Sequence, residues 1–203
     1  TLIITFIVTA ITVRIFPLSK KKDMYFSGKP AVKEERKKIT LHNAMEEAMT
    51  AYHQAPSLLE VIKMNFIDGF KMALNIAPSL LGVGMTGLLI ATYTPVFDII
   101  GYIFYPFTAL LQVPEAQLTA KALSLSIAEM LLPAPLVAGE GMAIATRMLV
   151  AIVSVSEILF FSASIPCMMG TDIPLKFSDY LLIWVERVIL SIILAGALML
   201  IVF

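Results

Sequence analysis

Long apolar runs are the feature that most restricts what this chain can fold into. Two of them, Met72–Ala91 and Tyr180–Phe203, are long enough for one helix to cross the hydrocarbon core of a bilayer, which takes about 20 residues. Of the 203 residues, 59% are hydrophobic and 15% are charged, whereas soluble domains average about half and about a quarter. A soluble fold could not bury this much apolar surface. The sequence therefore predicts an all-α integral membrane protein, a polytopic bundle of transmembrane helices.

Charge distribution divides the chain into three regions. Residues 1–16 are predicted to be the end of a transmembrane span, because apolar sequence comes first and the positive charges follow it, the reverse of a signal peptide. Residues 17–57 contain a strongly basic loop and then an amphipathic helix, and residues 58–203 form the main transmembrane domain. By the positive-inside rule, the basic segment 17–40 is predicted to be cytoplasmic. The apolar opening indicates that the chain is part of a longer protein.

The residue types argue against catalysis, metal binding and nucleic-acid binding. The basic segment has no interleaved aromatic residues and borders a membrane span, so no nucleic-acid partner is expected. Cys167 is the single cysteine, which excludes an internal disulfide framework. His42, Glu46 and His53 share one face of the predicted helix 41–54, which we interpret as a solvated face. No Ser-His-Asp set, phosphate-binding loop or HExxH motif occurs, so we expect no enzyme, no metal and no cofactor.

A glycine motif within the first long run offers a different hypothesis. Gly82, Gly84 and Gly87 have the G-x-G-x-x-G spacing of dinucleotide-binding loops, which follow a strand and open a helix. Here the motif lies inside an apolar run, where glycines let helices approach closely, and Gly82 with Thr86 forms a small-xxx-small pair. The glycines are therefore predicted to be packing residues.

The middle of the domain contains irregular sequence. In residues 122–147, an apolar helix of about three turns is predicted to stop at Pro133 and Pro135, and a new helix is predicted after Gly139 and Gly141. Broken helices at membrane depth form sites in transporters, where half-helix ends point at a substrate. A re-entrant hairpin and an ordinary turn between two short spans both fit this spacing.

Two further apolar segments complete the predicted bundle. Pro95–Val113 is predicted to be an apolar run broken by Pro106, and Met148–Met169 is predicted to be one continuous span. Ser57 and Glu60 have the spacing of a capping box, which predicts a helix start.

Polar residues on the apolar runs are candidates for substrate contact. Asn75 and Ser79 share a helical face, and Pro78 between them frees a backbone carbonyl nearby; Asp98 lies in the second run. Polar faces of membrane helices turn toward a bundle interior or an aqueous path. Interhelical packing by hydrogen bonds explains these residues equally well.

Two carboxylates are the strongest candidates. Glu129 lies one turn before Pro133, which leaves the Glu129 carbonyl without its helical partner, and Glu157 lies within an apolar run near Ser162 and Ser164. A carboxylate in hydrocarbon has to be protonated, paired, or bound to a cation or substrate. The alternative is a structural ion pair, for which Arg147 is the nearest basic residue in sequence.

Glu186 and Arg187 are adjacent in the last run. They lie nearer a span end, where snorkelling of their long side chains explains them.

Several of these segments together resemble a known family. The stretches DGFKMALNIAPSLLGVGMTGLLIATYTPVFDIIGYIFYPFTALLQVPEAQLTAKALSLSIAEMLLPAPLVAG, SEILFFSASIPCMMGTDIPL and IWVERVILSIILA are similar to the Gate, or nucleoside-recognition, membrane family and its bacterial YjiH-like subfamily. The resemblance runs from about residue 58 to the C-terminus. It implies the C-terminal half of a longer protein whose other half is a related unit, and kinship with concentrative nucleoside transporters. It also implies that Glu129–Gly141 is a hairpin tip, with Glu129 facing substrate.

The functional expectation combines these observations. The chain is expected to be half of a secondary transporter for a small polar solute, nucleoside-like by the resemblance, in the bacterial inner membrane. Its partners would be the lipid bilayer and a second Gate-like half, and Na⁺ or H⁺ would be the coupling ion. The alternative, permitted by spore-maturation relatives of the same family, is an assembly or scaffold subunit that transports nothing.

Overall fold

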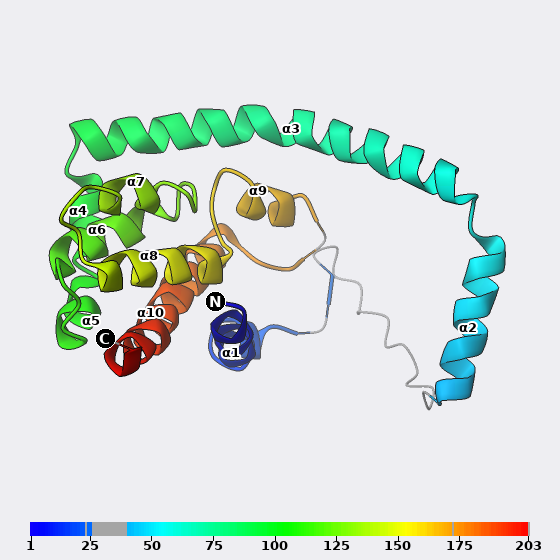
Figure 1. Ribbon diagram of the computed structural model, residues 1–203, viewed down its shortest axis with the longest axis horizontal. Helices are drawn as coiled ribbons and strands as arrows, with labels where there is room; N and C mark the ends of the chain where they lie inside the picture. Colours follow the sequence, from blue (N-terminus) through cyan, green and yellow to red (C-terminus); the bar gives the residue numbers. More distant parts are fainter. Residues whose placement is uncertain (23, 26–39, 172, 203) are drawn as a thin grey trace.

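The computed structural model describes residues 1–22, 24–25, 40–171 and 173–202, with the side chain of Ser79 excluded (Figure 1). Its regular structure is helical, which confirms the all-α prediction for the described part of the chain. The helices are α1 (Leu2–Thr12), the 3₁₀ turn η1 (Leu18–Lys20), α2 (Leu41–Gln54), α3 (Leu58–Tyr93), α4 (Val96–Gly101), α5 (Tyr105–Leu110), α6 (Ala116–Leu125), α7 (Pro133–Val137), α8 (Ile144–Glu157), α9 (Ser164–Met169) and α10 (Phe177–Val202). Among them, α3 and α10 are long and apolar enough to cross a membrane.

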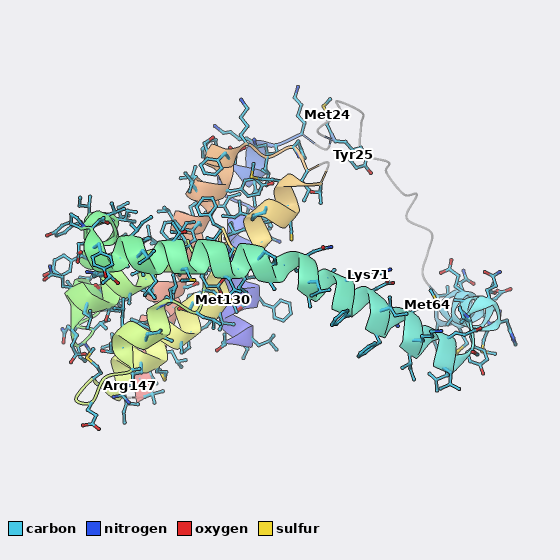
Figure 2. All side chains as sticks on the ribbon, turned by 90° about the horizontal axis from the view of Figure 1, so that it is seen from above. Met24, Tyr25, Met64, Lys71, Met130 and Arg147 are labelled. Carbon is cyan, nitrogen blue, oxygen red and sulfur yellow. The ribbon has the colours of Figure 1, made fainter. Side chains whose placement is uncertain are left out.

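Helix α3 runs along one side of the molecule, and its first half extends away from α4–α10 toward α2 (Figure 1). It begins at the predicted capping box: the Glu60 N–H donates to the Ser57 hydroxyl, and the Ser57 N–H donates to the Glu60 carboxylate. Pro78 lies inside this helix without ending it. Figure 2 shows Met64 and Lys71 on the extending part. Most of the apolar side chains of α3 are exposed, so this helix needs lipid or another protein surface around it.

The amphipathic helix predicted at 41–54 is α2, capped at its N-terminus by the Thr40 side chain, which accepts a hydrogen bond from the Asn43 N–H. All its residues are exposed, including His42, Glu46 and His53. Most of the basic segment that precedes it, residues 26–39, lies outside the described residues.

The packed core forms around α10, which contacts α8, α1 and α5, while α4 lies on α6. Two glycines make these contacts close. A Cβ atom on Gly101 would be 3.1 Å from the backbone nitrogen of Lys121, and one on Gly196 would be 2.5 Å from Cδ1 of Leu111. Small residues therefore set the distance between helices, as is common in membrane proteins.

The middle of the chain differs from the sequence prediction. Helix α6 ends at Leu125, not at Pro133, and Pro133 instead begins α7, because a proline at the first helical position has no N–H to leave unpaired. The prediction of one continuous span at Met148–Met169 is also wrong, because α8 ends at Glu157 and α9 begins at Ser164.

The run Pro95–Val113 is divided into α4 and α5, as predicted, although the division lies at residues 102–104, just before Pro106. The helix expected after the two glycines is α8, and Gly141 has the positive φ of 91° that favours glycine.

Candidate functional site

Two interrupted helices meet at their interruptions. We call residues 126–132, between α6 and α7, the first break, and residues 158–163, between α8 and α9, the second break. The Phe161 N–H donates to the Ile127 carbonyl at 2.8 Å, and the Ser162 N–H donates to the Ala128 carbonyl at 3.1 Å. Backbone groups that the helices leave unpaired are thus satisfied between the breaks, as buried backbone requires.

A carboxylate near or in each break accepts a hydrogen bond from a serine of the other interrupted helix. The Ser126 hydroxyl donates to Oε2 of Glu157 at 2.5 Å, and the Ser162 hydroxyl donates to Oε2 of Glu129. All four side chains are buried. The structure therefore brings together three sequence-predicted site residues, Glu129, Glu157 and Ser162, and adds Ser126, which the sequence analysis missed.

Helix α10 supplies a further donor to the same cluster. The indole N–H of Trp184 donates to Oε2 of Glu157 at 2.9 Å, and the ring packs edge-on against Phe104 with centroids 5.3 Å apart. The other oxygen of Glu157, Oε1, is buried and has no hydrogen-bond partner among the described residues. One oxygen of this carboxylate thus accepts two hydrogen bonds, and the other accepts none from the described residues.

Arg187, one turn further along α10, is buried as well. It donates to the backbone carbonyls of Ser156 and Glu157 and to the Thr9 hydroxyl. The snorkelling interpretation of Arg187 is therefore wrong. Trp184, Arg187 and Ser191 recur at helical spacing and are all buried, and this periodicity in the sequence could have identified the inward face.

The ion pair considered for the carboxylates does not form through Arg147. That side chain is exposed and donates to the Gly139 carbonyl at 2.8 Å (Figure 2). Asp98 pairs with Lys121 at 2.8 Å on the α4–α6 contact, away from the breaks. Ser164 bonds locally, to the backbone N–H and carbonyl of Phe160.

The remaining candidates do not join the cluster. Asn75 is exposed on α3, and the side chain of Ser79 lies outside the described part of the structure. Pro135 and Gly139 are exposed in α7 and in the turn that follows it. Within the described residues, no three histidine, cysteine, aspartate or glutamate side chains are grouped to hold a metal ion.

An open groove of about 700 Å³ lies against the breaks. Ile127, Ala128 and Phe161 of the breaks form one wall, and α3 and α4 form the others. Thr86 contributes the polar side chain of a lining that is otherwise apolar or glycine. Neither Glu129 nor Glu157 contributes to the lining of this groove.

The glycine motif on α3 has a packing role at one position. A Cβ atom on Gly87 would lie 2.8 Å from Cβ of Ala128, so the glycine lets α3 approach the first break. Gly82 and Gly84 have no such neighbour within 4 Å, so close packing is confirmed for Gly87 and not for the other two.

Ile158, which ends α8, has a left-handed backbone conformation with φ of 65°. A β-branched residue is strained there, and a left-handed conformation costs a non-glycine residue roughly 1–2 kcal/mol. Replacing Ile158 by glycine also removes the apolar contacts of its side chain. We therefore compare Ile158→Gly with Ile158→Ala, because both substitutions remove most of these contacts. We expect the glycine variant to be more stable by about 1 kcal/mol.

The control is the same pair of substitutions at Val155, an exposed residue inside α8. There the order should reverse, with alanine more stable than glycine by about 1 kcal/mol. Thermal unfolding of the four purified variants measures both differences. If glycine and alanine had the same order of stability at both positions, the second break would not hold Ile158 in the left-handed conformation.

Comparison with known proteins shows what the chain is similar to. The chain is 31% identical over 183 residues to an uncharacterized protein of Alkalihalophilus pseudofirmus. The match covers 88% of this chain and 39% of that protein, so the chain spans about two fifths of the relative's length. No family profile and no solved structure match the chain.

Proposed function

We propose that this chain is a multi-pass protein of the bacterial inner membrane and forms half of an ion-coupled secondary transporter for a small polar solute. The observation that supports it most is the meeting of two interrupted helices, each with a buried glutamate hydrogen-bonded to a serine of the other. Interrupted helices at membrane depth are a recurring way to build a transport site. The proposal extends the family resemblance, which implies a nucleoside-like solute and a second, related half.

The contacts between the breaks are suited to a change between two states. Two main-chain hydrogen bonds join the breaks, and two serine–glutamate hydrogen bonds join the two interrupted helices; each can be exchanged for a bond to solute or water. A neutral hydrogen bond contributes about 0.5–1.5 kcal/mol net and one to a charged group about 1.5–3 kcal/mol, so new hydrogen bonds to a bound solute can offset the loss of these contacts. Alternating access would then move one interrupted helix against the other.

Charge balance indicates that a cation accompanies this cluster. Glu129 and Glu157 are two buried carboxylates, whereas Arg187 is the only buried basic side chain among the described residues. An uncompensated buried charge is strongly unfavourable, so the second carboxylate needs a proton or a bound cation. This is the proposed coupling ion, H⁺ or Na⁺.

The groove against the breaks is the proposed entrance for the solute. Its volume of about 700 Å³ is within the range of about 300–1,000 Å³ that small-molecule sites have. Its walls are apolar, and Thr86 is the polar side chain among the lining residues. Such a lining favours a solute with a flat apolar face and a polar rim, as a nucleoside has.

The test uses the full-length natural protein reconstituted in liposomes. A thermal-shift screen of nucleosides, dipeptides and organic acids selects the solute, and uptake is then driven by an imposed pH or Na⁺ gradient. Glu129→Gln should reduce coupled uptake roughly tenfold or more, because a hydrogen bond to a charged group contributes about 1.5–3 kcal/mol and each 1.4 kcal/mol is a factor of ten. Glu140→Gln, at an exposed position, should leave uptake unchanged.

Equal uptake by wild type and the Glu129 variant would remove Glu129 from the mechanism. Absence of gradient-driven uptake for every solute would instead favour the second candidate, a membrane assembly subunit. The exposed apolar length of α3 is the observation that favours that alternative, because it offers a long surface to another protein.

A further inference from the structure

The guanidinium of Arg187 lies at the end of the interrupted helix α8. Its Nε donates to the Glu157 carbonyl at 2.7 Å, its Nη2 to the Ser156 carbonyl at 2.6 Å, and its Nη1 to the Thr9 hydroxyl at 3.1 Å. Three oxygens from two helices, α8 and α1, therefore surround one cation that is supplied by a third helix, α10.

The two carbonyl oxygens, those of Ser156 and Glu157, are electron-rich for a structural reason. The last carbonyls of a helix have no intrahelical donor, and the macrodipole adds a partial negative charge at this end. Here the helix ends at Glu157 because Ile158 turns left-handed, so the chain that follows does not supply the missing donors. In interrupted membrane helices, carbonyls at such an end are ligands for Na⁺.

We propose that Arg187 is a tethered cation, which permanently occupies a site that the C-terminal end of α8 would otherwise offer to Na⁺. A guanidinium attached to α10 satisfies the same oxygens that a free alkali cation would coordinate, and it cannot dissociate. The inference stands on this geometry and does not require the transport function. If transport is confirmed, the exchangeable cation has to bind elsewhere, at the carboxylates of the cluster.

Removing the tethered charge should reopen the site. In Arg187→Ala, the Ser156 and Glu157 carbonyls lose their donors, and the removed side chain leaves room for a small cation. We compare thermal unfolding of the purified protein in NaCl and in choline chloride at equal ionic strength, since choline is too large for the site. The variant should unfold at a lower temperature than wild type in choline chloride, and NaCl should recover several degrees of that loss.

Arg147→Ala is the matched control, because Arg147 is exposed and donates to a single carbonyl, that of Gly139. It should show no recovery by NaCl. An Arg187→Ala protein that unfolds at the same temperature in both salts would overturn the proposal, because the guanidinium would then act only as a hydrogen-bond donor.

Arg187→Lys keeps the proposal testable if the alanine variant does not fold. The ammonium preserves the tethered charge with fewer donors, so this variant should fold and show no greater response to NaCl than wild type. Two results would contradict the proposal: the lysine variant also fails to fold, or NaCl stabilises it several degrees more than wild type. Either result would show that a charge tethered at this position does not occupy the site.

Discussion

Glu157→Ala is expected to destabilise the protein more than any other single substitution in the cluster of the two breaks. Glu157 is fully buried, and its Oε2 accepts hydrogen bonds from the Ser126 hydroxyl and the Trp184 indole N–H. Alanine leaves the Trp184 N–H without an acceptor and also leaves a cavity, whereas the Ser126 hydroxyl can still donate to the Leu123 carbonyl at 2.6 Å. An unsatisfied buried donor costs about 1–3 kcal/mol and the cavity adds to this cost, so the expected loss is roughly 3 kcal/mol or more.

Glu157→Gln is the control that separates shape from charge. The amide oxygen of glutamine can accept the Trp184 hydrogen bond in the same position, so most of the stability should remain. An amide, unlike a carboxylate, carries no negative charge to bind a proton or a cation. Denaturant or thermal unfolding of the two variants gives the comparison. Similar losses for alanine and glutamine would mean that the charge, and not the hydrogen-bond acceptor, stabilises the site.

Trp184 provides a second readout of the same prediction. It is the only tryptophan of the 203 residues, it is 3% exposed, and its N–H is bonded to Glu157. In the isolated chain, Glu157→Ala should therefore change the emission of this tryptophan, whereas Glu140→Gln, at an exposed position, should not. Unchanged emission in the alanine variant would contradict the bonded geometry.

Local signals in the sequence were sufficient for part of the fold. The start of α3 follows from the Ser57–Glu60 capping box, and α2 follows from its amphipathic pattern, because both depend on residues within a few turns. The long apolar run after Tyr180 likewise predicts most of α10. Each of these features is determined by neighbours in sequence.

The two breaks depend on distant residues and were predicted poorly. The first break starts directly after Leu125, well before Pro133, and the second break contains neither glycine nor proline. What replaces the lost helical hydrogen bonds is the pairing of residues 127–128 with residues 161–162. Such tertiary compensation has no local signature, and the proline rule identified only the start of α7.

The residues of the candidate site, like the elements of the fold, could be predicted only in part from the sequence. Glu129 and Glu157 could be singled out because a carboxylate in an apolar run needs an explanation wherever it lies. Ser126 could not be chosen over the neighbouring serines, because its role depends on where the second interrupted helix crosses. Asn75 was singled out by the same polarity argument, yet it is exposed on α3, since polarity along a helix does not reveal which face meets the protein.

Gly101→Val is the second substitution with a large expected effect, because it acts on the backbone contact between α4 and α6. A Cβ atom at this buried position would lie 3.1 Å from the Lys121 nitrogen, 3.2 Å from its Cα and 3.3 Å from the Ala120 carbonyl carbon. These are backbone atoms, which cannot rotate away as a flexible side chain can. Overpacking of this kind costs about 1–3 kcal/mol, so the variant should unfold well below wild type.

Gly84→Val is the matched control for this contact. Gly84 also lies in a helix, α3, but an added Cβ atom would meet nothing within 4 Å. Both substitutions introduce the same β-branched residue into a helix, so the difference between them isolates the clash with α6. Since Asp98 on α4 is also joined to Lys121 on α6, a shift of these helices should weaken that ion pair too. Equal stability of the two variants would mean that α4 and α6 do not approach each other closely at Gly101. Other contacts would then have to determine the position of α6, the helix that leads into the first break.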